Sequence, residues 1–160
     1  MTPSTSRVLT HPLAFIGGGN MARSLIAGLV RQGVHGSAIH VAEPVQALRQ
    51  ALEQGQLRLH YQPIYDLRQG SISGFEALVR WQHPQRGLIA PGEFIPIAED
   101  NGMIGAIDTW VLEQACRQMV RWDAAGLAVP KMAVNLSVRQ FERGAIADTV
   151  SSVLRETGLD

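Results

Sequence analysis

Two kinds of hydrophobic pattern divide this chain, and the change from one to the other falls near Gly55. Before Gly55, short apolar runs alternate with apolar residues at helical spacing. We therefore expect strands at 13–16 and 38–42 and helices at 21–32 and 44–54. Strand, helix, strand and helix in this order predict a right-handed βαβ unit with parallel strands and one further helix.

After Gly55 the apolar residues alternate with polar ones, as they do in a strand with two different faces. Leu57, Leu59 and Tyr61 share one face of the first such strand. Turn residues around Gly70 connect it to a second strand, so the two predict a β-hairpin. The remaining elements that we expect are the second hairpin strand at 72–81, a proline-containing loop at 82–97, a long amphipathic helix at 107–125, a strand at 131–138 and a last helix at 145–156.

The composition of the 160-residue chain is that of an ordinary globular protein, with 46% hydrophobic and 18% charged residues. Its 14 basic and 14 acidic residues cancel, which gives no electrostatic reason to expect a nucleic acid polymer or a membrane surface as a partner. The single cysteine, Cys116, lies in an apolar helical pattern, so we expect a buried structural thiol. No apolar run approaches the ~20 residues of a membrane-spanning helix. We expect a cytoplasmic protein with a disordered tail at 1–11.

The glycine-rich turn between the first strand and the first helix is one candidate site. Gly17 permits a tight turn, Gly19 lets backbone amides approach a pyrophosphate, and Ala22 lets helix and strand pack closely. The N-terminus of the helix supplies free N–H groups for the anion. Glu43 ends the second strand, where a carboxylate can bind ribose hydroxyls. The alternative is a turn that needs glycine for backbone reasons alone, and we expect the turn without firm cofactor binding.

The stretches Phe15-Ile16-Gly17-Gly18-Gly19-Asn20-Met21-Ala22 and 25–29 carry a family resemblance over about the first third of the chain. There the chain resembles the start of pyrroline-5-carboxylate reductase, which implies a Rossmann fold and the nicotinamide cofactor NAD(P). The cofactor-binding residues that the resemblance implies are Gly17, Gly19, Asn20, Met21, Ala22 and Glu43. Glu43 would repel a 2′-phosphate, which argues against NADP. The further strands and the helical dimerisation domain of that family do not follow in this sequence.

The second candidate site lies on the predicted hairpin and on the strand at 131–138. Glu76, Leu78 and Arg80 share one strand face, because side chains alternate with period two. A carboxylate and a guanidinium on one face can hold a metal ion and a phosphate, respectively. Asn135 lies on the later strand, where its amide oxygen can complete a site for a hard cation. Taken singly, Glu76 is also explained as a solvated carboxylate, Arg80 as its ion-pair partner and Asn135 as a turn cap.

Ordered stretches from about residue 48 onward carry a second resemblance; they are Tyr61-Gln62-Pro63-Ile64, Phe75-Glu76-Ala77-Leu78-Val79-Arg80-Trp81, Pro91-Gly92-Glu93-Phe94-Ile95-Pro96, 107–116 and Val134-Asn135-Leu136-Ser137. Over about two thirds of its length the chain resembles the first part of an EAL-type cyclic di-GMP phosphodiesterase. The resemblance implies a TIM-like barrel with Mg²⁺ or Mn²⁺ ligated by Glu76 and Asn135. It implies contacts of Gln62 and Arg80 with cyclic di-GMP or its metal site, at the C-terminal ends of barrel strands.

Together the two resemblances predict an α/β chimera. A partial Rossmann-like βαβ unit at 12–54 is fused to a truncated (β/α) TIM-like barrel at 48–160, with the junction inside a shared helix at 48–54. Two-metal phosphate hydrolysis needs several carboxylates, and the family draws them from later strands, so we expect no turnover and at most weak binding of cyclic di-GMP. The alternatives are a pyrroline-5-carboxylate reductase-like remnant and a chimera without biochemical function. An open strand edge predicts homo-oligomerisation or aggregation.

Overall fold

The computed structural model describes residues 12–16, 20–138 and 146–159, and the chain divides into two compact units, Met1–Leu48 and Arg49–Asp160. In the first unit β1 (Leu13–Ile16) pairs in parallel with β2 (Ile39–Ala42), from Leu13 opposite Ile39 to Ile16 opposite Ala42. Helix α1 (Asn20–Arg31) and the short 3₁₀ helix η1 (Gly36–Ala38) lie between these strands in the chain. The predicted order of strand, helix and strand is confirmed.

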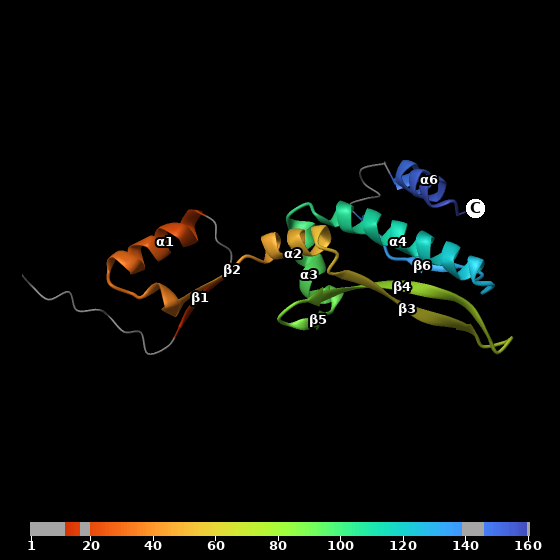
Figure 1. The fold of residues 1–160 in the computed structure, drawn as a ribbon, viewed down its shortest axis with the longest axis horizontal. Coiled ribbons are helices and arrows are strands. Elements are labelled where there is room, and N and C mark those ends of the chain that lie inside the picture. The colour runs from red at the N-terminus through yellow and green to blue at the C-terminus, as the bar shows by residue number, and fades with distance from the viewer. Residues whose placement is uncertain (1–11, 17–19, 139–145, 160) are drawn as a thin grey trace, which may run out of the picture. The chain divides into compact units, whose positions relative to one another are not determined.

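The second unit is built on a four-stranded sheet with β4 at its centre (Figure 1). Strand β4 pairs antiparallel with β3 and β5 and parallel with β6. The predicted hairpin is therefore present. The elements are α2 (Pro44–Glu53), which spans the boundary between the units, β3 (Leu57–Asp66), β4 (Ser71–His83), β5 (Gly87–Ile89), α3 (Pro91–Asp100), α4 (Ile104–Ala124), β6 (Met132–Val134) and α6 (Ile146–Thr157).

One face of the sheet packs on helices and forms the core. The ring of Trp122 on α4 lies 5.0 Å from the rings of both Tyr61 and Phe75, measured between centroids. Trp81 meets Phe94 of α3 edge-on at 6.0 Å. Because side chains alternate along a strand, the residues between these ones lie on the opposite face, which we call the open face. It includes three exposed residues of β3, Arg58, His60 and Gln62, and three half-buried residues of β4, Glu76, Leu78 and Arg80.

A smaller apolar cluster attaches the last helix to the unit. Leu112 and Cys116 of α4 and Val153 of α6 are buried together, and Val150 and Leu154 pack against them. Cys116 is a free, buried cysteine, as its place in the apolar pattern predicted. Burial raises the pKa of its thiol, and a hydrogen bond with Thr157 offsets part of that rise.

Two predictions for the second unit are wrong in detail. The segment 82–97 is not a loop, because it contains β5 and most of α3. Pro91 occupies the first turn of α3, where a backbone N–H has no helical partner to lose, and burial of Phe94 and Ala98 holds the helix against the sheet. The strand expected at 131–138 is shorter, Met132–Val134, because its pairing with β4 ends there.

Candidate functional site

Two side chains far apart in the sequence meet at the edge between β4 and β6. The parallel register places Glu76 beside Ala133, and Asn135 follows just after β6 ends. The Asn135 Nδ2 atom donates a hydrogen bond of 2.6 Å to Glu76 Oε1. The structure therefore brings together the carboxylate and the amide that the sequence offered as metal ligands.

A glycine in β4 permits this approach. Gly74 is buried, and a Cβ atom at its position would lie only 2.7 Å from the Lys131 backbone oxygen and 2.5 Å from Lys131 Cγ. The same oxygen accepts a 3.0 Å hydrogen bond from the Phe75 N–H. The start of β6 thus lies against β4 at a distance that a side chain at position 74 would prevent.

The open face also carries the two residues proposed to contact a cyclic dinucleotide. Gln62 of β3 lies directly opposite Glu76, and its side chain is exposed. Arg80 is half-buried, and its Nη1 atom donates to the Val79 carbonyl oxygen at 2.8 Å. Because antiparallel neighbours that lie directly opposite share one face, Glu76, Gln62 and Arg80 are on the same surface.

The register adds one basic residue that the sequence patterns did not single out. Arg58 of β3 lies directly opposite Arg80, and its Nη1 atom donates to the carbonyl oxygens of Gly55 and Leu57. Salt bridges form elsewhere in the second unit, between Arg86 and Glu93 and between Arg117 and Glu113. Like charges placed opposite each other across strands repel, so an anion bound on the open face would relieve this repulsion.

A buried carboxylate on α4 binds the chain two residues after Asn135, at Ser137. Asp108 of α4 is only 5% exposed, and its Oδ2 atom accepts hydrogen bonds from the Ser137 N–H at 3.0 Å and from the Ser137 hydroxyl at 2.7 Å. The sequence patterns missed Asp108. One signal was available, because Asp108 continues the helical spacing of the buried residues Ile104, Val111 and Ala115.

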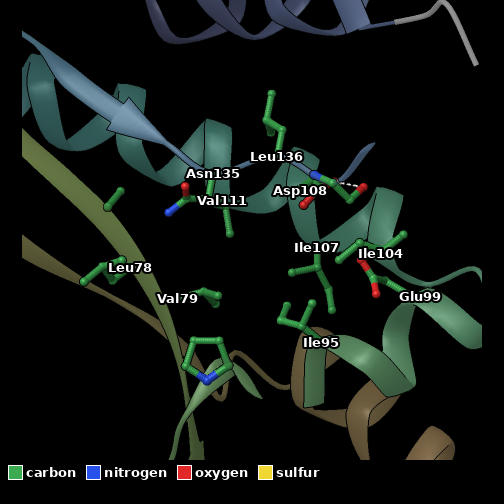
Figure 2. Close-up of a pocket in the computed structure, with 13 residues that line it drawn as sticks. Leu78, Val79, Ile95, Glu99, Ile104, Ile107, Asp108, Val111, Asn135 and Leu136 are labelled. Atoms are coloured by element: carbon green, nitrogen blue, oxygen red, sulfur yellow. Dashed lines mark hydrogen bonds between the residues drawn. The ribbon is translucent and has the colours of Figure 1, made fainter. Parts of the chain in front are cut away.

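A cavity of ≈ 240 Å³ is lined by residues of β4, α3 and α4 and lies beside this segment (Figure 2). Its wall is largely apolar and includes Val79, Ile95 and Ile107, and Asn135 and Asp108 contribute polar atoms to it. Figure 2 shows Asn135 on the segment that follows β6 and Asp108 on the helix that the segment crosses. The cavity thus lies beside the Glu76–Asn135 pair, and its size suits solvent or a small group.

The donor set fits part of a site for a hard cation. The oxygens of Glu76 and Asn135 are of the type that Mg²⁺ and Mn²⁺ prefer. Asn135 presents its nitrogen to Glu76, so joint ligation requires the amide to turn its oxygen inward. Across the described residues there is no group of three or more His, Cys, Asp or Glu side chains that could hold a metal ion. The pair could therefore supply at most two ligands of such a site, which needs more.

The residues predicted to bind a nicotinamide cofactor are only partly covered by the structure. Gly17 and Gly19, and the side chain of Asn20, lie outside the described residues. Met21 is 79% exposed, and Ala22 and Glu43 are half-buried.

Among the helices that the structure describes, none has the length and apolar character needed to cross a membrane.

Two family models match this chain, over ranges that overlap. The EAL domain model matches residues 45–160, and the chain therefore belongs to the EAL domain family. A second model, NADP oxidoreductase coenzyme F420-dependent, matches residues 12–61. The resemblance to EAL-type proteins is thus confirmed. The N-terminal match supports a reductase-like resemblance there, without identifying pyrroline-5-carboxylate reductase.

Curated relatives include two proteins of Pseudomonas aeruginosa. The chain is 50% identical over 113 residues to the bifunctional diguanylate cyclase/cyclic di-GMP phosphodiesterase MucR. The aligned stretch covers 71% of this chain and 16% of MucR. It is 46% identical over 114 residues to the cyclic di-GMP phosphodiesterase NbdA, and this aligned stretch covers 71% of this chain and 15% of NbdA. The chain therefore spans less than a fifth of the length of these relatives.

Solved structures support the fold of the second unit. A complex of the MucR phosphodiesterase with c-di-GMP superposes with a TM-score of 0.69 at 49% identity, over 72% of this chain and 47% of the other. The FimX EAL domain from Pseudomonas aeruginosa bound to c-di-GMP superposes with a TM-score of 0.64 at 26% identity, over 74% of this chain and 47% of the FimX chain. The second unit is thus a mixed α/β fold similar to TIM-barrel-like EAL domains.

Proposed function

We propose that residues 45–160 carry part of a cyclic di-GMP phosphodiesterase site. In this proposal Glu76 and Asn135 ligate Mg²⁺ or Mn²⁺, while Gln62 and Arg80 contact the cyclic dinucleotide or the metal site. The observation that carries the proposal is the 2.6 Å hydrogen bond between Asn135 and Glu76, which holds two oxygen-bearing side chains together at a strand edge. MucR and NbdA, which are named as cyclic di-GMP phosphodiesterases, support the substrate class.

The open face is suited to an anionic ligand with flat bases. Arg80 and Arg58 place two guanidinium groups on one surface, and guanidinium groups bind phosphate through paired hydrogen bonds. The exposed Gln62 amide can both donate to and accept from a purine edge. A bound divalent cation would supply Lewis-acid chemistry to phosphodiester hydrolysis. The residues of this chain would hold that cation and orient the phosphate.

We also propose that the 160-residue chain, assayed by itself, binds cyclic di-GMP weakly and does not hydrolyse it. Hydrolysis by two metal ions requires several carboxylates to hold both ions. Beside Asn135 the structure places the Glu76 carboxylate. The described residues contain no group of three or more His, Cys, Asp or Glu side chains that could hold a metal ion. One carboxylate and one amide are too few for the reaction.

Two measurements test these statements separately. Calorimetric titration with cyclic di-GMP in Mn²⁺ should show weak binding that Arg80→Gln reduces about 10-fold or more, because a charged hydrogen-bond partner is lost. Arg68→Gln, which removes an exposed charge at the hairpin turn, is the matched control. Equal affinities for both variants would contradict the assignment of Arg80. Hydrolysis is followed by chromatography of the linear product, and turnover above that of Glu76→Ala would contradict only the proposed inactivity.

The N-terminal unit favours a second candidate function. The parallel β1–β2 pair and the family match at 12–61 support a fused, partial Rossmann-like segment that descends from a nicotinamide-dependent reductase. The junction then lies within 48–54, a range that begins in α2 and ends one residue after it. A thermal-shift titration distinguishes the candidates: NADH or NADPH would stabilise a working dinucleotide site, whereas only cyclic di-GMP should stabilise the chain in the leading proposal. Stabilisation by neither supports a chimera without biochemical function.

Self-association through a strand edge is part of the same proposal. Within the described residues, β6 pairs with β4 along one edge and its other edge has no strand partner. Such edges pair readily with other chains. Sedimentation velocity should therefore show species larger than a monomer as concentration rises, and a single monomeric species at all concentrations would contradict this expectation.

A further inference from the structure

The segment from Lys131 to Ser137 is held at its two ends by different parts of the fold. At the start, the Phe75 N–H donates to the Lys131 carbonyl oxygen at 3.0 Å. At the end, the N–H and hydroxyl of Ser137 both donate to Asp108 Oδ2. Asn135, which meets Glu76, lies between these two anchors.

Strand pairing alone does not hold Asn135 in place. The ladder between β4 and β6 contains three residue pairs, and the last of these joins Ala77 to Val134. Asn135 therefore lies beyond the ladder. Ser137, two residues further on, is anchored by two hydrogen bonds to one buried carboxylate oxygen, Asp108 Oδ2.

Apolar packing does not explain an aspartate at this position. Asp108 is 5% exposed and lies among buried residues of α4 such as Ile104, Ile107 and Val111. Burying a carboxylate carries a desolvation cost that a leucine would avoid. The carboxylate does, however, accept two hydrogen bonds from Ser137, and charged acceptors form the stronger hydrogen bonds.

We propose that Asp108 is a positioning residue, which anchors Ser137 so that the Asn135 amide stays against Glu76 where a divalent cation binds. This inference rests on the proposed metal-binding role of Glu76 and Asn135. In this proposal Asp108 acts on the metal site through Ser137 and Asn135, and is not itself a ligand. Residues that orient metal ligands in this way typically change metal affinity by about 10- to 100-fold when they are removed.

The experiment uses NMR of the full chain and Mn²⁺ as a paramagnetic probe. The side-chain amide signal of Asn135 is identified by its loss in Asn135→Asp. In Asp108→Leu this signal should move toward the position of a free asparagine, and the Mn²⁺ concentration that broadens it should rise about 10-fold. Asp108→Asn keeps an acceptor oxygen of the same shape and should restore both properties to within about threefold.

Two further variants separate positioning from general loss of structure. Ser137→Ala keeps its backbone N–H bond and loses only the hydroxyl bond, so Mn²⁺ broadening should weaken by about threefold. Asp123→Asn changes an exposed acid on the same helix and should behave as wild type. If Asp108→Leu does not fold, Ser137→Ala decides the question, and a wild-type response in that variant overturns the inference.

The outcome also distinguishes this inference from the proposed function. If Glu76→Ala leaves the Mn²⁺ broadening of Asn135 unchanged, the proposed metal site is wrong, and the positioning role fails with it. If Glu76→Ala abolishes the broadening while Asp108→Leu and Ser137→Ala both match wild type, the metal site stands and only the role of Asp108 is wrong.

Discussion

Substitution of Gly74 by alanine should separate β6 from β4 and so disturb the Glu76–Asn135 pair. The added Cβ atom would lie 2.7 Å from the Lys131 carbonyl oxygen, whereas ordinary contact begins at 3.4 Å. Lys131 must therefore recede by about 0.7 Å, which stretches its 3.0 Å hydrogen bond from Phe75 N–H toward about 3.7 Å. A contact of that length is no longer a hydrogen bond.

The size of the effect follows from three contributions. Overpacking in a core costs about 1–3 kcal/mol, and the lost hydrogen bond costs about 1 kcal/mol. Alanine reduces the entropy of the unfolded chain, which offsets about 0.4–1 kcal/mol. Gly74 is not among the glycines with positive φ, so backbone strain adds nothing. We expect a net loss of about 2 kcal/mol in the free energy of unfolding, and a lower Tm by about 6–9 °C.

Urea and thermal unfolding measure this loss, with Gly92→Ala as the matched control. Gly92 lies in α3, and a Cβ atom there would meet nothing within 4 Å. The double variant Gly74→Ala/Lys131→Ala should remain destabilised, because it removes the Lys131 side chain but leaves the backbone oxygen. Equal stability of Gly74→Ala and Gly92→Ala would refute the steric argument. Full recovery in the double variant would assign the clash to the flexible side chain instead.

Three further predictions concern the core of the second unit. Burial raises the pKa of the Tyr61 hydroxyl, and the nearby Arg121 opposes this shift. As pH rises above about 10, the unfolded chain loses the hydroxyl proton before the folded chain does, so the free energy of unfolding falls until the pH passes the raised pKa. Urea unfolding measured across this pH range should show a smaller fall for Tyr61→Phe. Cys116 should react with a thiol reagent at pH 8 far more slowly than free cysteine until urea is added; equal rates would contradict its burial. Trp81→Phe removes the 3.1 Å hydrogen bond from Nε1 to Gln56 and should cost about 1–2 kcal/mol in urea unfolding; an unchanged midpoint would show that solvent replaces the bond.

Much of the local structure could be predicted from the sequence because it depends on periodicity. Alternation with period two located the hairpin and placed Glu76 and Arg80 on one face. Helical spacing located α4 to within three residues at its start, Ile104 instead of 107. The prediction of a loop at 82–97 was wrong because it was based on the prolines in this segment. A proline in the first turn of a helix, such as Pro91 in α3, costs no hydrogen bond.

The candidate site itself could be assembled from the sequence only through a family resemblance. Nothing in the local pattern says that Asn135 meets Glu76, since the two are 59 positions apart. Their contact depends on the register of a three-residue parallel ladder and on the space left by Gly74. The facing positions of Arg58 and Arg80 likewise depend on hairpin register.

Residue patterns alone thus predicted the strands and helices in most of the chain, and which side chains share a strand face, because these properties follow from backbone periodicity. Tertiary structure alone decided which strand ends lie together and which polar groups are buried. Asp108 illustrates the difference: its spacing marks a buried position, but only the approach of Ser137 from a distant segment gives that buried carboxylate its hydrogen-bond donors. Long-range contacts of this kind depend on how whole elements pack, and no local pattern of residues encodes them.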